Sequence, residues 1–577
     1  MKKKLLPALI VTGLIILVVI IMGITALINK YTPTKKTEDL KEYFNISSDD
    51  EAALIVNNEL SDYKAKIIDK KIYVDYKFVH DSLNSRFYWD ANENVLLYTT
   101  ASDIISAAAD SNSYSVTKQT NDFGYPIVKA TSDSALIALD YVKQYSNITF
   151  KSYDDPARIV ITSKWDEIDS ATVSKSTQVR VKGGIKSPIL KEVKKDDKIT
   201  ILDSGDKWDK VATEDGVIGY IKRKALSESK KTKLTNPDYE EETFTHIKKD
   251  KDICLAWNQV TSQSANSKVP QVISSTKGIN VMSPTWFYLN DNNGNLADIA
   301  SKDYVSYCHS QGIEVWGLFS NLENTDVDAA YVLTHTSTRT TLINQIMSAA
   351  FNYELDGVNI DFENITEAAY GDSYIEFIRE LSIKCHNNGI SLSVDVTVPA
   401  SFNKFFNRSD MAKFADYIVI MGYDEHYKGS DAGSVSSIPW VTEGVESTLK
   451  EVPADQIILG MPFYTRIWEL TPKEDDDAVT DTEDQSKYTV ASQVYSMDAA
   501  AAQLATNNAT AALDEESGQN YAEWSASNKL YKVWLEDSTS LEKRLKLVDD
   551  NKLAGAAFWK LGFENSSVWD TVIKYLD

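Results

Sequence analysis

The segment Asp356–Glu363 alternates apolar and polar residues and places Asn359, Asp361 and Glu363 at every second position. That period is typical of a strand. Neighbours on one face of a strand lie about 6.6 Å apart, two rises of ~3.3 Å, so the carboxyl groups of Asp361 and Glu363 can meet. Two carboxyls that close do not ionise independently, and one is driven toward the protonated form that a general acid needs near neutral pH. The alternative is an ordinary charged strand that faces solvent.

This segment lies among apolar strands separated by helical stretches, which indicates a buried parallel sheet. Carboxylates in such a sheet must face a cavity. From residue 253 onward the alternation of strands and helices predicts a (β/α)₈ barrel, the TIM barrel. The eight predicted strands are Ile253–Trp257, Ile279–Trp286, Ile313–Phe319, Asp356–Glu363, Ser391–Val398, Tyr417–Tyr423, Ile457–Tyr464 and Gly555–Leu561.

About ninety residues separate the seventh and eighth predicted strands, far more than the ~2–6 of an ordinary loop between strand and helix. They contain an acidic segment, Glu474–Asp484, then an Ala-rich helix and the strand pair Tyr521–Ser525 and Leu530–Leu535. We interpret residues 465–535 as an inserted α+β subdomain.

The order Asp-Gly-x-x-x-Asp-x-Glu, from Asp356 to Glu363, resembles the catalytic signature of glycoside hydrolase family 18, the chitinase-like enzymes. Residues Met421–Asp424 resemble the Met-x-Tyr-Asp motif of that family, and Met461–Arg466 contains its Pro-Phe-Tyr-x-Arg pattern. Trp559 ends the eighth predicted strand, where the family keeps a tryptophan as the floor of the sugar subsite. The resemblance covers about 330 of the 577 residues.

The resemblance implies a mechanism in which Glu363 protonates the glycosidic oxygen and then activates water. The 2-acetamido oxygen of the substrate attacks the anomeric carbon, while Asp361 and Tyr423 hold the acetamido group; this family is a substrate-assisted exception among retaining glycosidases. The substrate must therefore carry an N-acetyl group at C2, as N-acetylglucosamine does. No metal or cofactor is implied.

The predicted substrate-binding residues belong to these motifs or are aromatic residues at strand ends, because sugar rings present apolar faces that stack on aromatic side chains. They are Asn359, Asp356, Met421, Asp424, Tyr464, Arg466, Trp559, Trp257 and Trp286. A single tryptophan at a strand end is more often part of a core than of a ligand site.

Chitinases usually have an aspartate at the position of Asn359. Without that like charge, Asp361 is expected to ionise more easily, and Asn359→Asp is expected to have a mild effect. The asparagine, together with Ser283–Phe287 on the second strand, resembles the spore-cortex and cell-wall branch of the family.

Upstream of the barrel the chain changes pattern several times. Residues 51–168 are α+β and resemble the N-terminal domain of copper amine oxidases, without a histidine cluster that would imply copper. Residues 169–228 form short strands, and Trp208–Val211 with Gly219–Ile221 resemble a bacterial Src-homology-3-like (SH3-like) wall module. That resemblance implies binding to the cell wall, and a spacer that binds nothing is the alternative. The remaining predicted segments are an anchor (1–30), a stalk (31–50), a linker (229–245) and the catalytic barrel (246–577).

Lys2–Lys4 precede an apolar run from Leu5 to Ile28, long enough to span a bilayer. The basic flank predicts a single-pass cell-membrane protein with its catalytic domain extracellular. Cleavage after Ala26, followed by secretion, is the alternative. The net charge of −24, from 60 basic and 84 acidic residues, disfavours nucleic acid and anionic membrane surfaces as partners. Three scattered cysteines form neither a disulfide framework nor a zinc site.

The sequence thus predicts a membrane-anchored extracellular glycoside hydrolase that cleaves β-1,4 bonds next to N-acetylglucosamine, in peptidoglycan or in chitin-like glycans. The alternative is a family-18 lectin that binds such glycans at the wall without cleaving them. Lectins of this kind typically lose the terminal glutamate, which this chain keeps as Glu363.

Overall fold

The computed structural model describes residues 5–363, 365, 368–473 and 484–576. The predicted basic tip Lys2–Lys4 and residues 474–483 of the acidic segment lie outside them. The chain divides into two compact units: unit 1 is Met1–Trp89, Ala107–Tyr114 and Asn121–Glu241, and unit 2 is Asp90–Ser106, Ser115–Thr120 and Glu242–Asp577.

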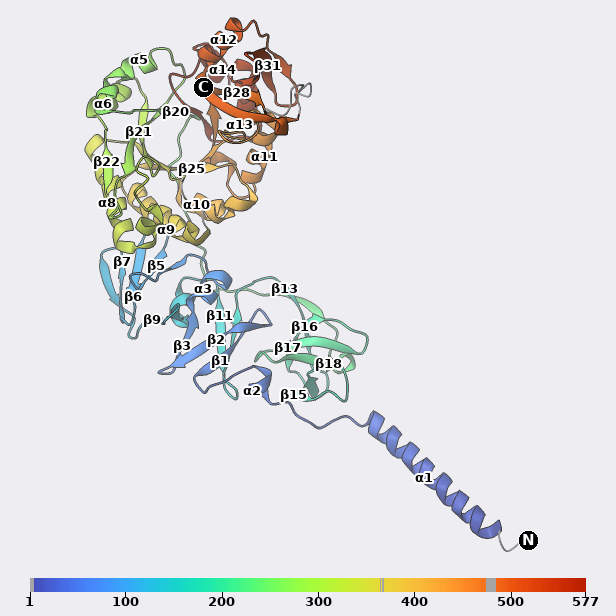
Figure 1. Ribbon diagram of the computed structural model, residues 1–577. Coiled ribbons are helices and arrows are strands. Elements are labelled where there is room, and N and C mark those ends of the chain that lie inside the picture. Colours follow the sequence, from blue (N-terminus) through green and yellow to red (C-terminus); the bar gives the residue numbers. More distant parts are fainter. Residues whose placement is uncertain (1–4, 364, 366–367, 474–483, 577) are drawn as a thin grey trace. The chain divides into compact units, whose positions relative to one another are not determined.

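The apolar run near the N-terminus forms α1 (Leu5–Tyr31), drawn in blue in Figure 1. From Pro7 onward its side chains are exposed. Among the described residues it is the one helix long and apolar enough to cross a membrane, a test that a signal sequence near the N-terminus also passes.

Unit 1 contains two seven-stranded sheets. The strands of the first, in spatial order, are β11 (Thr149–Tyr153), β12 (Arg158–Thr162), β1 (Glu51–Val56), β2 (Glu59–Ile68), β3 (Lys71–Asp75), β10 (Ala135–Ala138) and β9 (Val128–Ala130). The strands of the second are β15 (Ile189–Val193), β14 (Thr177–Arg180), β18 (Ile218–Lys222), β17 (Trp208–Thr213), β16 (Lys198–Asp203), β13 (Glu167–Thr172) and β19 (Lys230–Lys233).

The two sheets of unit 1 bury side chains in one hydrophobic cluster. Phe44 and Ile55, before and within β1, pack in the same core as Val179, Leu190 and Val211 of the second sheet. Burial of each such apolar side chain stabilises the folded state by about 1.5–3 kcal/mol. The sheets therefore stabilise each other across the predicted domain boundary at residues 168 and 169.

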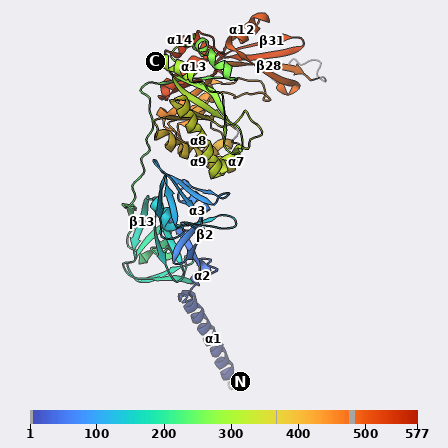
Figure 2. The same cartoon turned by 90° about the vertical axis from the view of Figure 1, so that its left-hand side faces the viewer.

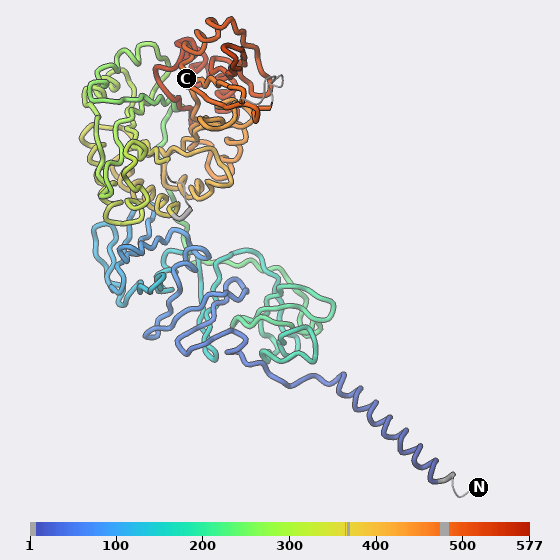
Figure 3. The backbone as a smooth tube through the Cα atoms, viewed as in Figure 1, coloured from blue at the N-terminus to red at the C-terminus, as the bar shows by residue number. Residues whose placement is uncertain are grey.

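Unit 2 contains a closed barrel of parallel strands, which confirms the predicted barrel (Figures 1 and 3). In chain order its strands are β20 (Ile253–Asn258), β21 (Val281–Leu289), β23 (Glu314–Ser320), β24 (Gly357–Asp361), β25 (Ser391–Thr397), β26 (Tyr417–Met421), β27 (Ile457–Pro462) and β33 (Gly555–Trp559). Pairing of β20 with both β33 and β21 closes the barrel.

Side chains alternate between two cores along these strands. On β24, Val358 and Ile360 pack outward into the core shared with the surrounding helices. Trp316 of β23 packs inside the barrel, and a Cβ atom at Gly357 would lie 2.6 Å from its ring. The glycine of the Asp-Gly motif is therefore required by the close approach of that tryptophan.

Between β27 and β33 the chain forms a five-stranded antiparallel sheet that stands beside the barrel within unit 2 (Figure 2). Its strands, in spatial order, are β29 (Tyr488–Ser496), β28 (Tyr464–Pro472), β32 (Lys529–Leu535), β31 (Gln519–Ala526) and β30 (Ala512–Asp514), and helix α12 (Met497–Thr506) packs on β28 and β29.

The first N–H groups of helix α8 (Thr336–Tyr353) in the barrel donate hydrogen bonds to a distant part of unit 2. Its N-cap residue, His335, gives no side-chain cap. Instead, a carboxylate oxygen of Asp90 accepts hydrogen bonds from the Thr336 backbone N–H and hydroxyl, both at 2.6 Å. Glu93 accepts from the Ser337 N–H at 3.1 Å.

Candidate active site

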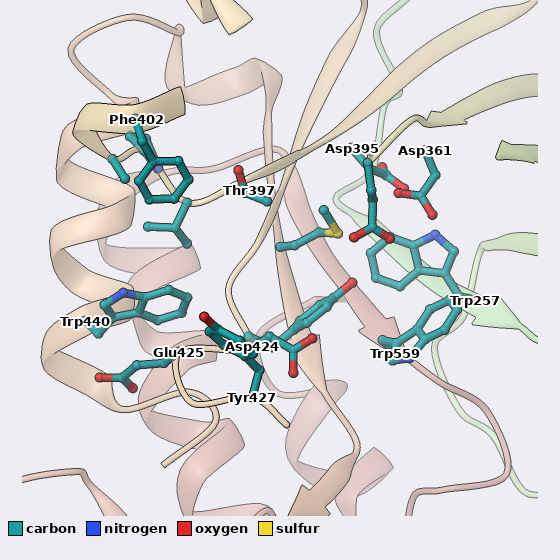
Figure 4. Close-up of a pocket in the computed structure, with 16 residues that line it drawn as sticks. Trp257, Asp361, Asp395, Thr397, Phe402, Asp424, Glu425, Tyr427, Trp440 and Trp559 are labelled. Carbon is teal, nitrogen blue, oxygen red and sulfur yellow. The ribbon is translucent and has the colours of Figure 1, made fainter. Parts of the chain in front are cut away.

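A cavity of about 550 Å³ opens at the carboxyl ends of the barrel strands. Its lining residues are Trp257, Asp361, Glu363, Asp395, Thr397, Val398, Pro399, Ala400, Phe402, Met421, Tyr423, Asp424, Glu425, Tyr427, Trp440 and Trp559. In Figure 4 Trp257 and Trp559 lie at the end of the cavity near Asp361 and Asp395, and Phe402 and Trp440 lie at the other end. The cavity therefore combines carboxylates with aromatic walls.

Strand β24 delivers the predicted carboxylates to this cavity. Asp361 is its last residue, and Glu363 follows two positions later. The Glu363 backbone N–H donates to Asn321 Oδ1 at 3.0 Å, which fixes the chain where it leaves the strand. Both Asp361 and Glu363 line the cavity, in agreement with the prediction that their carboxyl groups lie close together.

Asn359 lies one layer below the cavity floor, and its side-chain amide makes four hydrogen bonds. Its Oδ1 accepts from Trp257 Nε1 at 2.9 Å and from Ser283 Oγ at 3.0 Å. Its Nδ2 donates to Ser393 Oγ at 3.0 Å and to Asp395 Oδ1 at 2.7 Å. The residue is fully buried, so its predicted contact with substrate is replaced by a supporting role beneath the carboxylates.

Asp361 is buried, and no hydrogen bond within the described residues reaches its Oδ1. Burial, followed by the charges of Asp395, Glu363 and Glu323, raises the pKa of Asp361 well above its usual range. The neutral amide at position 359 therefore does not leave the pKa of Asp361 low. Asp395, on the neighbouring strand, supplies a like charge that the sequence reasoning did not consider.

Glu363 is exposed at the mouth of the cavity. Partial burial, together with the negative charges of Asp424 and Glu323, nevertheless raises its pKa. A carboxyl group with a raised pKa keeps its proton closer to neutral pH, as a general acid requires.

Tyr423 lies two residues after the end of β26 and lines the cavity beside Trp257, with ring centroids 6.5 Å apart. Burial and the neighbouring carboxylates Asp361, Asp395 and Glu363 raise the pKa of its phenol, so the hydroxyl stays a hydrogen-bond donor. Met421 and Asp424, from the same motif, also line the cavity.

Tyr464 and Arg466 support the cavity from behind. The Tyr464 hydroxyl donates to a carboxylate oxygen of Asp424, and an Arg466 guanidinium nitrogen lies 3.8 Å from the same oxygen. Neither residue is part of the lining. They position Asp424, which lies at the cavity.

Trp257 and Trp559 form one wall, with ring centroids 5.9 Å apart at 65°. Trp257 is buried and donates to Asn359, whereas Trp559, the last residue of β33, is half-exposed to the cavity. Trp559 thus presents the open ring face that a sugar can contact.

Two predicted substrate-binding residues lie away from the cavity. Trp286 is fully buried, donates from Nε1 to Asn266 Oδ1 at 2.8 Å and packs on Tyr304, outside the barrel strands. Asp356 precedes β24 at the opposite end of the barrel, where it accepts from the Val315 N–H at 2.8 Å and contacts His309 at 2.8 Å. Both are structural, because their positions along the strands turn them from the cavity.

The sequence reasoning missed several cavity residues. Asp395 could have been predicted, because it lies two positions after Ser393, on the same face of the alternating strand Ser391–Thr397. Phe402, Tyr427 and Trp440 come from loops and helices beyond the strands, where no alternation marks them. Among the described residues no group of three or more His, Cys, Asp or Glu side chains could hold a metal ion.

Comparison with known proteins agrees with this geometry. Residues 319–564 match the family described as Glycosyl hydrolases family 18. The uncharacterized glycosylase YvbX of Bacillus subtilis (strain 168) is 24% identical over 301 residues, which are 49% of this chain and 81% of that protein.

The cortical fragment-lytic enzyme of Bacillus subtilis (strain 168) is 25% identical over 287 residues, and the match covers 48% of this chain and 63% of that enzyme. This chain therefore spans less than two thirds of the length of that second relative. The crystal structure of the Bacillus cereus spore cortex-lytic enzyme SleL superposes with a TM-score of 0.50 at 18% identity, over 60% of this chain and 77% of that one. That likeness concerns the fold. Residues 319–564 of the barrel therefore match glycosyl hydrolases family 18, and the relatives support a glycoside hydrolase barrel.

Proposed function

We propose that this protein hydrolyses β-1,4 bonds next to N-acetylglucosamine in a polysaccharide, by substrate-assisted retaining catalysis. The observation that carries the proposal is the cavity in which Glu363, Asp361 and Tyr423 meet beside the half-exposed ring of Trp559. A buried carboxyl, an exposed acid and a neutral phenol next to an aromatic wall suit an N-acetylated sugar better than a charged or purely apolar ligand.

In the proposed reaction Glu363 donates a proton to the glycosidic oxygen, and the bond from that oxygen to the anomeric carbon breaks. The acetamido oxygen of the substrate forms the new bond to the anomeric carbon, giving an oxazolinium. Asp361 and the Tyr423 hydroxyl hold the acetamido group during this step. Glu363, now ionised, removes a proton from water as the water opens the oxazolinium, which returns the enzyme to its first state.

Peptidoglycan is the proposed substrate in preference to chitin. Two of the similar proteins are named for lysis of spore cortex or its fragments, and the net charge of −24 suits a protein that works outside the membrane. Chitin oligomers share the N-acetylglucosamine unit and serve as the test of the alternative.

We further propose that α1 anchors the protein in the cell membrane and that the barrel lies outside. In this arrangement residues 51–168 and the SH3-like segment 169–228 form the part between anchor and barrel. The second sheet of unit 1, β13–β19, is the proposed wall-binding element. Its strand β19 takes up the start of the predicted linker 229–245, so residues 234–245 are the proposed linker.

Digestion of purified peptidoglycan and of chitin oligomers, followed by mass analysis of the products, tests the reaction. New reducing ends at N-acetylglucosamine are expected from peptidoglycan. Glu363→Gln keeps the shape of the side chain but cannot donate the proton, so the rate should fall about 10²–10⁴-fold while binding to the glycan survives. If the parent binds a glycan as tightly as Glu363→Gln does and cleaves none, the protein is a lectin.

A further inference from the structure

Asp395 lies level with Asp361 on the neighbouring barrel strand. In the parallel pair β24–β25, Asn359 is opposite Ser393 and Ile360 is opposite Val394, so the next pair in register is Asp361 and Asp395. Adjacent strands lie about 4.8 Å apart. Asn359 and Ser393 are bonded to each other inside the barrel, and side chains two positions on point the same way. Asp361 and Asp395 therefore face the cavity side by side (Figure 4).

The hydrogen bonds of Asn359 explain why position 359 holds a neutral amide and not a carboxylate. Its Oδ1 already accepts from Trp257 and Ser283, which leaves only its NH₂ group to face Asp395. A carboxylate at position 359 would bring a second acid to the place where Nδ2 now lies 2.7 Å from Asp395 Oδ1. Two buried carboxylates at that distance cannot both be ionised. Asparagine at 359 and aspartate at 395 are thus complementary.

We propose that Asp395 is the carboxylate that shares a proton with Asp361, and that it takes the place of the aspartate that chitinases usually have at the position of Asn359. Asp395 is a positioning residue in this scheme, because it acts on substrate through Asp361. The inference rests on the proposed function, since it assigns how the acetamido-binding carboxyl is kept protonated in the empty site.

The proton has a defined path in the scheme. Asn359 donates to Asp395 and so favours the negative charge there, which leaves the shared proton on Asp361 while the site is empty. As the acetamido group becomes the oxazolinium, the proton passes from Asp361 to Asp395. Asp361 then carries the negative charge next to the new positive charge. No proton is gained or lost by the pair.

The charged neighbours that raise the pKa of Asp361 are all acidic: Asp395 on β25, Glu363 after β24 and Glu323 after β23. The phenols of Tyr423, after β26, and Tyr374, on α9 (Ala368–His386), also interact with both aspartates, and their pKa values are raised by burial and by these charges. Removing the charge of Asp395 should therefore let Asp361 lose its proton at lower pH.

The test compares the parent with Asp395→Asn, Asn359→Asp and the double variant Asn359→Asp/Asp395→Asn. Asp395→Asn keeps an acceptor for Asn359 and removes the charge. We expect kcat to fall about 10²-fold with little change in KM, and the alkaline limb of the kcat/KM profile to move down by about one pH unit or more. Asn359→Asp should be almost inactive near neutral pH, which reverses the mild effect expected from the sequence.

The double variant returns one carboxylate and one amide to the pair in exchanged positions. We expect the double variant to be at least about tenfold more active than the less active single variant, and its alkaline limb to return to that of the parent. Asp303→Asn, which removes an exposed carboxylate on α6 (Lys302–Ser310), is the control and should match the parent. The proposal is overturned if the alkaline limb does not shift in Asp395→Asn. It is also overturned if the double variant is no more active than the less active single variant.

A second readout does not require activity. With ¹³C-labelled aspartate carboxyl groups, the titration midpoint of Asp361 should fall by about one pH unit or more in Asp395→Asn, and an unchanged midpoint overturns the pairing. If the parent cleaves no N-acetylglucosamine polymer, the proposed function fails while this titration still decides the pairing. If Asn359→Asp does not fold, Asp395→Asn and the double variant give the answer.

Discussion

At the scale of single residues, the active site depends on groups whose protonation is set by their neighbours. Tyr423 illustrates this, because burial and three carboxylates hold it as a neutral phenol. In the proposed reaction, a neutral phenol can donate a hydrogen bond to the acetamido oxygen in any pH range where Glu363 is protonated. Its raised pKa therefore makes it a dependable donor rather than a base.

We expect Tyr423→Phe to lower kcat about 10²–10³-fold, since removal of one donor aimed at developing charge typically costs that much. KM should change little, because the ring and its contact with Trp257 remain. Steady-state kinetics on an N-acetylglucosamine oligosaccharide measure both constants. The control is Tyr353→Phe, which removes a hydroxyl bonded to Asp298 at 2.7 Å, away from the cavity. Equal losses in the two variants would contradict a catalytic role for the Tyr423 hydroxyl.

The alternation of side chains along a strand, inside and outside the barrel, explains most of the correct and incorrect predictions for the site. Asp361 and Glu363 were placed by alternation alone. The same rule, applied to β21, puts Ser283 inside the barrel and Trp286 outside, where the structure has both. Trp286 was predicted because it is an aromatic residue at a strand end, and Asp356 because it belongs to the motif. Alternation was not applied to either residue, or to Asp395.

At the scale of elements, the barrel strands could be predicted because each is a short apolar run flanked by helices. The hydrogen-bond partners at the ends of helices could not be predicted, since hydrogen bonds between distant segments leave no local sequence pattern. Helix α8 is the example: residues 90 and 93 satisfy the N–H groups of residues 336 and 337. Nothing in the sequence near Thr336 indicates that its cap lies in another part of the chain.

Asp90→Ala should destabilise unit 2 by about 0.5–2 kcal/mol, the usual loss when a helix N-terminal acceptor is removed. Urea unfolding followed by tryptophan fluorescence measures this change. The control is Glu515→Ala, in an exposed turn of unit 2, for which a change within about 0.5 kcal/mol is expected. No difference between the two variants would show that solvent replaces Asp90 at the start of α8.

At the scale of the whole molecule, two segments with different sequence patterns share a hydrophobic core. The α+β and SH3-like segments are predicted as separate domains from a change of pattern and from two resemblances, and Ile55 and Val179 pack in one core. A change of pattern reports local structure, whereas a domain is defined by burial between residues far apart in sequence. Deleting the SH3-like segment would therefore expose the apolar side chains of β1, so wall binding is better tested with surface variants.

The final prediction concerns α1. An apolar helix of this length, exposed from Pro7 onward, has no protein core to bury it within its own unit and is long enough to span a bilayer. We expect the full chain to sediment with membranes and to be released by detergent but not by high salt, because apolar insertion is insensitive to screening. A chain of residues 33–577 should stay soluble and turn over a soluble oligosaccharide at the same rate. Protease added outside intact cells should remove the barrel. Recovery of most of the protein in the medium, with an N-terminus near Leu27, would instead identify α1 as a cleaved signal sequence.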